Sequence, residues 1–395
     1  MITVEEAKQL LFSKIEKTNF QTIDISESTG CVLAETIFSP IDLPSFNQSA
    51  MDGYALASSD EHKNKFKVIG EIKAGDAGSV QLQSGQAVRI FTGAEVPASA
   101  DAVVIQEKTE RVNGSIHLSE AVRQGDCIRY KGSQIKAGEV ALKTGTLLNP
   151  AAIGFLASIG IQKVSVYKKP DVSLITTGNE LVKPGKTLMR GQVYESNSFA
   201  LQAALNQMHI RPKNNLSTGD EIKSLSLKIE ESLNDSDVVI LTGGISVGKY
   251  DLVHEALMSL EVETIFYKVD QKPGKPFFFG KLKDKLIFAL PGNPAAVLVC
   301  FYEYIYPALR MLQGIENASL HSLKLKLLKD ISKKEDRAQF IRAIKVNDGV
   351  MPLEKQDSNM LRSFAEADSL IYVPIENQVL NQGEEVEVHL LPFNN

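Results

Sequence analysis

The sequence predicts a multidomain protein of the α/β plus all-β class, in which an α/β segment lies between two β-rich segments. Three observations predict this class. Strand-like and helix-like runs alternate between residues 170 and 315, short β-like runs separated by Gly, Ser and Asp occupy residues 36 to 145, and β-like runs return after residue 316. Alternation is typical of a parallel sheet covered by helices, whereas short strands between turn residues are typical of all-β domains.

The composition is that of a protein with a large core and no disulfide framework. The chain has 395 residues, enough for two to four domains, and 43% of them are hydrophobic. A net charge of -5 argues against a general nucleic-acid binder. Cys31, Cys127 and Cys300 lie far apart, as expected in a reducing compartment. The sequence shows no signal-peptide core and no run of about 18 apolar residues. We therefore expect a cytoplasmic protein that binds neither nucleic acid nor a membrane.

A helix is predicted at each end of the first β-rich segment. Residues 3 to 17 carry a narrow apolar face, and Thr3 and Glu6 match a capping box. That face comprises Val4, Ala7, Leu10, Leu11 and Ile15. Residues 150 to 161 predict a short buried helix, which we expect to return to the N-terminal helix. The β-rich segment between the two is then an insertion.

Three buried strands of the α/β segment each end in an unusual loop. The strands are "DVSLITTG", "DVVILTGG" and "KLIFAL", and their loops are "TGNEL", "TGGISVGKYD" and "LPGNP". Helices are predicted from "SNSFALQAALNQM", "EIKSLSLKIEESL", "YDLVHEALMSL" and residues 295 to 312. Ligands of open parallel sheets bind at the carboxyl ends of the strands. The three loops therefore indicate a ligand site at that edge.

The loop of residues 242 to 251 is nearly a phosphate-binding P-loop. Gly243, Gly248 and Lys249 have the P-loop spacing, but Tyr250 stands where a Ser or Thr would ligate the nucleotide's magnesium. Nucleoside triphosphate hydrolysis is therefore the weakest hypothesis for this chain. The loop could hold an oxyanion at a helix start, or its glycines could merely allow a tight turn.

Two further loops have residue types that suit anions. Lys272 and Lys275 flank a Pro-Gly turn in "DQKPGKPFFFG", where a rigid backbone would hold two ammonium groups close together. The alternative is an ordinary solvated connection. Pro291 and Pro294 stiffen "ALPGNPAAV" between a strand and a helix, either as a plain connection or as the wall of a site.

Four carboxylates occur in turns and not on periodic surfaces. They are Asp52, Glu180, Asp220 and Asp251. Hard cations such as Mg²⁺ prefer oxygen ligands of this kind, although Asp251 could equally be a helix cap. The six histidines show no metal-ligand spacing, and no nucleophile elbow is present.

Seven motifs in a fixed order resemble the MoeA family, the molybdopterin molybdotransferases, to which the C-terminal part of gephyrin also belongs. The motifs are "SAMDGYAL", "TGAEVPASADAVV", "TTGNEL", "GQVYESNS", "TGGISVGKYD", "KPGKPFFFG" and "LPGNPAA". The resemblance covers nearly the whole chain, roughly residues 1 to 392.

The resemblance implies four domains and a homodimer with its site in the cleft between subunits. The implied domains are an elongated arm of residues 1–20 and 146–169, a β-rich lid of residues 21–145, a three-layer α/β molybdopterin-binding domain of residues 170–315, and a β-barrel of residues 316–395. The implied reaction inserts molybdate into adenylylated molybdopterin with release of AMP, assisted by Mg²⁺. A separate molybdopterin adenylyltransferase would supply the substrate.

The resemblance also implies roles for particular residues. Gly243, Gly244, Ser246 and Gly248 would line a phosphate cradle that Asp251 follows. Lys272 and Lys275 would hold phosphate or molybdate, and Pro291 and Pro294 would shape the pocket. Asp52 and Thr92 would reach in from the lid. Glu180 and Asp220 would bind Mg²⁺ or orient water. Arg129 matches the first arginine of a family motif, R-R-x-G-x-D.

The chain departs from the family pattern in three places. Tyr130 replaces the second arginine of that motif, Gln134 stands where an aspartate is common, and Glu195 replaces the aspartate of the usual Tyr-Asp-Ser. A neutral amide such as Gln134 cannot act as a base. A non-catalytic molybdopterin-binding or scaffolding protein of the same fold is therefore the alternative hypothesis. A tungstate-inserting enzyme is a third, because nothing in the sequence separates the two metals.

Overall fold

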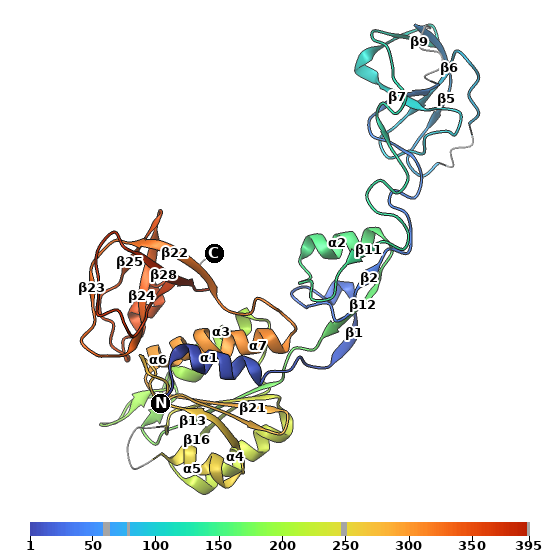
Figure 1. The fold of residues 1–395 in the computed structure, drawn as a ribbon. Coiled ribbons are helices and arrows are strands. Elements are labelled where there is room, and N and C mark those ends of the chain that lie inside the picture. Colours follow the sequence, from blue (N-terminus) through green and yellow to red (C-terminus); the bar gives the residue numbers. More distant parts are fainter. Residues whose placement is uncertain (58–63, 77–79, 246–250, 393–395) are drawn as a thin grey trace. The chain divides into compact units, whose positions relative to one another are not determined.

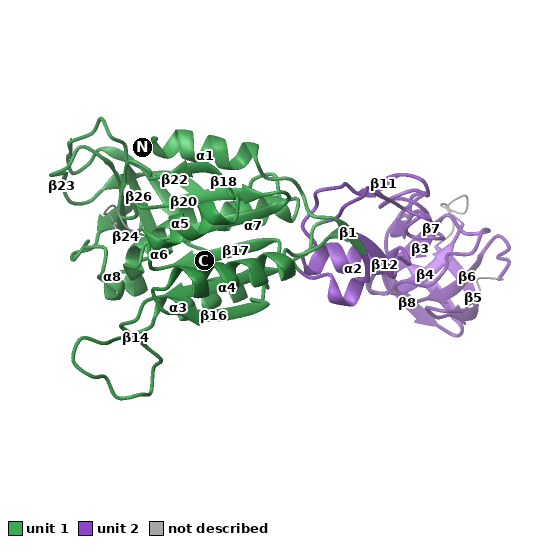
Figure 2. Ribbon diagram, turned by 90° about the horizontal axis from the view of Figure 1, so that it is seen from below, with its two compact units in different colours: residues 1–21, 30–32, 166–395 green, residues 22–29, 33–165 purple. Residues whose placement is uncertain are grey.

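The computed structural model describes residues 1–57, 64–76, 80–245 and 251–392, and the chain divides into two compact units (Figure 2). Unit 1 comprises residues 1–21, 30–32 and 166–395, and unit 2 comprises residues 22–29 and 33–165. The α/β plus all-β class is confirmed, because unit 1 contains an α/β domain and a closed barrel, and unit 2 contains a further sheet. The domain boundaries given above stay predictions.

A six-stranded sheet forms the centre of the α/β domain. Its order is β16(Asn214–Thr218), β13(Val172–Thr177), β17(Val238–Thr242), β21(Lys285–Leu290), β20(Phe278–Leu282) and β18(Glu263–Tyr267). The first four strands are parallel, whereas β20 runs antiparallel to both β21 and β18. The sequence predicted a parallel sheet, and this prediction is only partly right, because the sheet is mixed. Only residues 283–284 join β20 to β21, and so short a connection permits antiparallel pairing alone.

Helices cover both faces of this sheet and make three layers (Figure 1). One face packs against α1(Val4–Ser13), α3(Asn197–Gln207), α6(Pro294–Cys300) and α7(Tyr306–Leu312), and the other packs against α4(Ile222–Asp235) and α5(Leu252–Ser259). Strand side chains alternate between the two cores because their period is two. Val172 and Leu174 enter the first core, and Ile175 enters the second.

The N-terminal helix differs from its prediction in its length and in the exposure of Leu10. The capping box of Thr3 and Glu6 is confirmed, but the helix ends at Ser13 and Leu10 is 37% exposed. Helix α1 packs into the core of unit 1, whereas α2(Pro150–Ser158) belongs to unit 2. The expected return of the second helix to the first stays a prediction.

The predicted helix of residues 295 to 312 is continuous but contains a π-helical turn. Residues Phe301–Ile305 form that turn between α6 and α7. Pro307 explains it, because a proline has no N–H to donate to the carbonyl four residues earlier. The span Pro294–Leu312 is apolar and long enough to cross a bilayer, but 78% of that window is buried, so it is a core helix.

The C-terminal segment is a closed five-stranded barrel, one of the two forms that the sequence left open. Its strands are β22(His321–Leu327), β24(Ala338–Val346), β25(Gly349–Pro352), β26(Ser369–Val373) and β28(Glu385–Leu390). Strands β24 and β26 close the ring. The short strand β19(Gln271–Lys272) of the α/β domain adds to β24. Three shorter elements accompany the barrel: β23(Ile331–Ser332), β27(Val379–Leu380) and α8(Leu361–Glu366).

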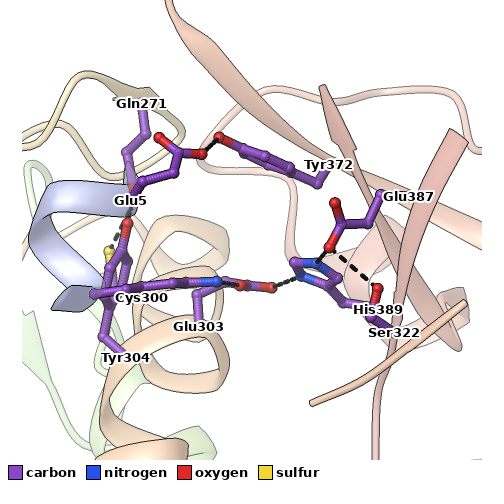
Figure 3. A network of polar contacts seen from close by, with 10 residues as sticks. Glu5, Gln271, Cys300, Glu303, Tyr304, Ser322, Tyr372, Glu387 and His389 are labelled. Carbon is purple, nitrogen blue, oxygen red and sulfur yellow. Dashed lines mark hydrogen bonds and ion pairs between the residues drawn. The ribbon is translucent and has the colours of Figure 1, made fainter. Parts of the chain in front are cut away.

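A buried ion cluster joins the barrel to the α/β domain (Figure 3). Glu303 of the π-helical turn, with its side chain 1% exposed, accepts from Lys8 Nζ of α1 at 2.6 Å and pairs with His389 Nδ1 of β28 at 2.8 Å. Burial alone would raise the pKa of Glu303, but Lys8 and His389 lower it to about 2. Burial likewise opposes the charge of His389, but Glu303 and Glu387 raise its pKa to about 9.

Further hydrogen bonds flank this ion cluster. The Tyr372 hydroxyl of β26 donates to Glu5 of α1. The Tyr304 hydroxyl donates to Gln271, whose amide donates in turn to the carbonyl of Pro273 at 3.0 Å. Helix α1, the π-helical turn and the barrel are thus joined by polar contacts as well as by apolar packing.

Unit 2 is mostly sheet, and its described residues contain no α-helix other than α2. A six-stranded sheet has the order β7(Ala102–Ile105), β4(Gly53–Leu56), β6(Gln86–Ile90), β5(Lys65–Ile72), β9(Ser115–Leu118) and β8(Thr109–Val112). The smaller pairs are β2(Ile37–Phe38) with β11(Val140–Leu142), and β3(Gln48–Ser49) with β10(Ile128–Arg129). β1(Phe20–Asp24) pairs with β12(Lys163–Tyr167).

In the α/β domain, β14(Leu181–Val182) pairs with β15(Val193–Tyr194).

Candidate functional site

A cavity of about 490 Å³ lies at the carboxyl edge of the parallel strands in the α/β domain. That volume is in the range of small-molecule sites. Its lining comes from the last residues of β13 and β17, the loops after β13, β16, β17 and β21, and the first residues of α3 and α5: Thr176, Thr177, Gly178, Glu180, Leu181, Asn197, Asp220, Thr242, Gly243, Gly244, Ile245, Leu252 and Gly292. The three unusual strand-end loops therefore meet at one cavity.

The glycine turn after β17 has no room for side chains. Gly243 has φ +87°, and a Cβ there would lie 2.2 Å from the carbonyl oxygen of Thr177. Gly244 has φ +63°, and a Cβ there would lie 2.7 Å from Thr177 Cγ2. Both values exclude an ordinary side chain. The Gly243 N–H donates to Leu290 O at 3.3 Å, so its amide is used inside the sheet edge.

The two carboxylates of the cavity are held differently. Asp220 accepts from the Thr177 hydroxyl at 3.0 Å and from the Asn179 N–H at 3.3 Å. Its own N–H donates to Asn179 Oδ1, which ties the loop after β16 to the loop after β13. The carboxylate of Glu180 lies over Gly178, where a Cβ would be 2.8 Å from Oε2. Asp220 is thus fixed by hydrogen bonds, whereas the exposed Glu180 lies close to the glycine of its own turn.

Neutral side chains complete the polar lining. Asn197 Nδ2 donates to Thr242 Oγ1 at 3.0 Å and to Gly292 O at 2.9 Å. Among the described residues, Asn197 Oδ1 and Thr176 Oγ1 are buried and have no hydrogen-bond partner. Buried polar atoms are usually satisfied, so two unsatisfied atoms in one lining mark the cavity as a polar, ligand-type site.

Comparison with known proteins covers the chain from end to end. Residues 2–160 match the MoeA N-terminal region (domain I and II), residues 173–311 match a probable molybdopterin binding domain, and residues 324–391 match the MoeA C-terminal region (domain IV). A molybdopterin molybdenumtransferase of Haemophilus influenzae is 33% identical over 100% of this chain and 99% of its own length.

The chain belongs to the MoeA family.

A second MoeA-type relative and a solved structure agree with this assignment. A molybdopterin molybdenumtransferase of Nostoc sp. is 32% identical over 100% of this chain and 94% of its own length. The crystal structure of a molybdopterin biosynthesis MoeA protein from Pyrococcus horikosii has a TM-score of 0.84, with 33% identity over 99% of both chains. The chain is accordingly a transferase enzyme of molybdenum cofactor biosynthesis.

Of the residues that the MoeA resemblance singles out, four line the cavity: Glu180, Asp220, Gly243 and Gly244. Pro291 lies beside it and accepts from the Thr242 hydroxyl through its carbonyl at 3.3 Å. Pro294 occupies the first turn of α6. Ser246 and Gly248 lie outside the described residues. No group of three metal-binding side chains gathers anywhere in residues 1–57, 64–76, 80–245 or 251–392.

Asp251 is a helix cap in this structure, as one of the two hypotheses for it proposed. It accepts from His254 N at 3.0 Å at the start of α5. The Tyr267 hydroxyl also donates to it. Burial and this carboxylate raise the pKa of Tyr267 well above its usual value, so the hydroxyl keeps its proton. Asp251 is not part of the described cavity lining.

The two predicted anion-binding lysines are not among the cavity's lining residues either. Lys272 Nζ pairs with Glu335 Oε1 at 2.7 Å, and Arg337 lies 3.4 Å from the other oxygen of that carboxylate. The hydrogen bond from Lys272 lowers the pKa of Glu335, and the positive charge of Lys275 also lowers it. These cations form a cluster where β19 joins the barrel.

The remaining predicted residues belong to unit 2. Asp52 Oδ1 accepts from both the N–H and the hydroxyl of Thr92, each at 2.8 Å. The bond from the Thr92 N–H is the main reason that the pKa of Asp52 lies below its usual value. Arg129 lies exposed at the end of β10, and Gln134 is also exposed. Asp52 and Thr92 are 40 residues apart in the sequence but are joined directly by two hydrogen bonds.

Glu195 explains one departure from the MoeA pattern. Its carboxylate accepts from Ser198 N at 2.7 Å and from Ser198 Oγ at 2.6 Å at the start of α3. A glutamate can cap the helix in this way as an aspartate could, because both place a carboxylate at the N–H groups of the first turn.

Sequence reasoning gave no individual role to Asn197, Thr177 or Thr242. All three lie inside motifs quoted above, "GQVYESNS", "TTGNEL" and "TGGISVGKYD", and these motifs are their local signal. Their hydrogen-bond partners lie 43 to 95 residues away in the chain, so no local pattern predicts the contacts.

Proposed function

We propose that this enzyme inserts molybdate into adenylylated molybdopterin, with release of AMP, at the cavity on the carboxyl edge of the sheet. One observation carries the proposal: a side-chain-free glycine turn and two carboxylates, Glu180 and Asp220, line the same cavity of about 490 Å³. A substrate with a phosphoanhydride needs close backbone approach at its phosphates and acidic groups for a metal or water. MoeA relatives named molybdopterin molybdenumtransferases support the substrate class.

The glycine turn would receive the phosphate end of the substrate. Gly243 and Gly244 let the turn pack closely against Thr177, because a Cβ at either position would clash there. Ser246 and Gly248, outside the described residues, belong to the same proposed phosphate cradle. The Gly243 amide is already used by Leu290, so its contribution is the absence of a side chain. Pro291 and Pro294 would keep the facing loop rigid. Asp251 would act from the start of α5, beyond the described lining.

The donor set fits Mg²⁺. Magnesium is commonly held by one or two carboxylates together with water and substrate phosphate, and Glu180 and Asp220 offer two carboxylates in one cavity. Bound there, Mg²⁺ would neutralise charge on the phosphate oxygens. Asp220 is held in place by Thr177 and Asn179, so it would be the pre-oriented ligand, and Glu180 would bind metal or orient water.

Lys272 and Lys275 would bind molybdate or phosphate as a cationic cluster. Lys272 is now paired with Glu335, so an incoming dianion would have to compete with that carboxylate. A doubly charged oxyanion interacts more strongly with two ammonium groups than a single carboxylate does.

The site would be completed in a homodimer, with Asp52, Thr92 and Arg129 contributed by the lid of the partner subunit. A molybdopterin adenylyltransferase would supply the substrate in the cytoplasm. Mixing Asp52→Ala and Glu180→Gln subunits tests the shared site. We expect each variant alone to be inactive and the mixture to regain part of the activity, because one of two sites in a mixed dimer has both residues. No recovery in a demonstrated mixed dimer would contradict a shared site.

The deciding experiment is single-turnover release of AMP from adenylylated molybdopterin, with and without molybdate and with and without Mg²⁺. We expect release that requires both and that yields active cofactor. Tight binding of the pterin nucleotide without AMP release would contradict the proposal and favour a carrier. It would also single out Gln134 as the residue to revert to aspartate.

A further inference from the structure

Asn197 lies where three segments of the α/β domain meet. It is the first residue of α3, and its amide nitrogen donates to Thr242 Oγ1 at the end of β17 and to Gly292 O in the loop after β21. Thr242 in turn donates to Pro291 O at 3.3 Å. One amide group thus joins the start of a helix to the ends of two neighbouring strands.

The hydrogen bonds fix the orientation of this amide. The carbonyl of Gly292 can only accept, and the Thr242 hydroxyl gives its proton to Pro291 O, so both contacts of Asn197 require N–H donors. If the amide were reversed, the Asn197 carbonyl oxygen would point at Gly292 O and Thr242 Oγ1, which both act as acceptors here. An aspartate or a leucine at position 197 could make neither bond.

The two loops that Asn197 joins are in backbone contact. A Cβ built on Gly292 would lie 3.9 Å from Gly243 Cα, and the Gly243 N–H donates to Leu290 O. No side chain of either glycine can act as a spacer between them. The side-chain hydrogen bonds of Asn197 and Thr242 therefore act together with the Gly243–Leu290 backbone bond to hold the Gly243–Gly244 turn against the loop of residues 291–294.

We propose that Asn197, acting through Thr242 and Gly292, is a positioning residue that sets the spacing of these two loops for the transfer reaction. The proposal rests on the function proposed above, in which the phosphate end of the substrate lies against the glycine turn. A displacement of about 1 Å in such a site lowers a rate by about 100-fold. Asn197 therefore controls the rate at saturating substrate more than it controls substrate affinity.

The test uses variants that differ in one hydrogen bond at a time. Thr242→Ser keeps the hydroxyl and serves as the conservative variant, whereas Thr242→Val removes it at nearly constant volume. Asn197→Ala removes both donated bonds. Asn214→Ala is the matched control, because Asn214 Nδ2 also donates to a strand residue, Ser173, at 3.2 Å, but at the start of β16 and away from the cavity.

Two quantities are measured on the full-length protein: single-turnover AMP release and amide hydrogen exchange at Gly243. We expect release to fall about 100-fold in Asn197→Ala and about 10-fold in Thr242→Val, to fall less in Thr242→Ser than in Thr242→Val, and to be unchanged in Asn214→Ala. Exchange at Gly243 should accelerate in the first two variants only. If those two match Asn214→Ala in both measurements, the proposal is overturned.

The exchange measurement separates this proposal from the proposed function. A wild-type protein that releases no AMP would contradict the proposed function, whereas Gly243 exchange would still decide whether Asn197 sets the loop spacing. Unchanged exchange at Gly243 in both Asn197→Ala and Thr242→Val would overturn the proposal that Asn197 sets the spacing of the two loops. Should Asn197→Ala fail to fold, the comparison of Thr242→Val with Thr242→Ser gives the same decision.

Discussion

The strand-end cavity and the Glu303 cluster are both polar regions of unit 1, but they are built in opposite ways. In the cluster, the buried charges of Glu303, Lys8 and His389 are paired with one another. In the cavity, Asp220 and Asn197 are held by hydrogen bonds to uncharged groups, and Thr176 Oγ1 and Asn197 Oδ1 have no partner among the described residues. Paired charges suit a region whose role is to stay closed, whereas unsatisfied groups suit a region that receives a ligand.

The largest expected difference between the two regions is catalytic. Asp220→Asn keeps the shape of the side chain but removes its charge, so we expect single-turnover AMP release to fall by about 1,000-fold. The free energy of unfolding should change little, because the side chain lies at a solvent-exposed turn. Rates and urea unfolding curves measured on the same preparations check this, and a loss of stability large enough to explain the lost rate would contradict it.

The cluster should show the reverse. Glu303→Gln leaves Lys8 and His389 without their shared anion in a buried place, and we expect a loss of about 3–5 kcal/mol in the free energy of unfolding. Glu387→Gln is the control, because it removes the other carboxylate of His389, which is 49% exposed and should contribute about 0–1 kcal/mol. Urea unfolding compares them. Equal losses in the two variants would contradict the prediction that the buried carboxylate of Glu303 stabilises the fold more than the half-exposed carboxylate of Glu387.

The same cluster predicts a pH dependence of stability. The folded-state pKa of His389 is raised to about 9, above the unfolded value near 6.5. The stabilisation that protonated His389 gives to the folded state is therefore complete below about pH 6.5 and is lost as the pH rises toward 9. The free energy of unfolding should fall by about 3 kcal/mol over this range. Unfolding measured between pH 6 and 9.5 should show this decline in wild type and a flatter profile in His389→Gln. Identical profiles would contradict the ion pairing.

The smallest expected change in stability separates the cavity's glycines from ordinary turn glycines. Gly243→Ala meets a carbonyl at 2.2 Å with φ +87°, and we expect a loss of about 1–3 kcal/mol together with lost AMP release. Gly185 has a similar φ of +89° but no atom within 4 Å of a built Cβ. Gly185→Ala should therefore show only the backbone strain and keep its activity. Equal activity in both variants would remove the glycine turn from the proposed site.

Much of the fold could be predicted because its signals are local. The capping box of Thr3 and Glu6 spans four residues, and the runs that became β13 and β17 are mostly apolar, as is typical of doubly covered parallel strands. The face of α1 was harder. Leu10 fits the apolar stripe by spacing but is 37% exposed, because the neighbours that bury Leu11 do not extend over it.

The candidate site could be predicted only in part. Parallel strands place their carboxyl ends on one edge, so the meeting of the strand-end loops follows from the pattern. The hydrogen bonds that fix them do not. Asn197 finds partners 45 and 95 residues away, and Lys272 pairs with Glu335, 63 residues away. Whether these side chains are free for a ligand or bound within the protein depends on long-range packing, which no sequence window contains.

The most direct test of this account measures two quantities on Asp220→Asn and Glu303→Gln: single-turnover AMP release at a temperature where each is folded, and the free energy of unfolding. We predict that Asp220→Asn loses AMP release and keeps its stability, whereas Glu303→Gln loses stability and keeps AMP release within about 3-fold of wild type. If Asp220→Asn keeps its rate, or if Glu303→Gln is the variant that loses it, the cavity at the strand ends is not where the reaction takes place.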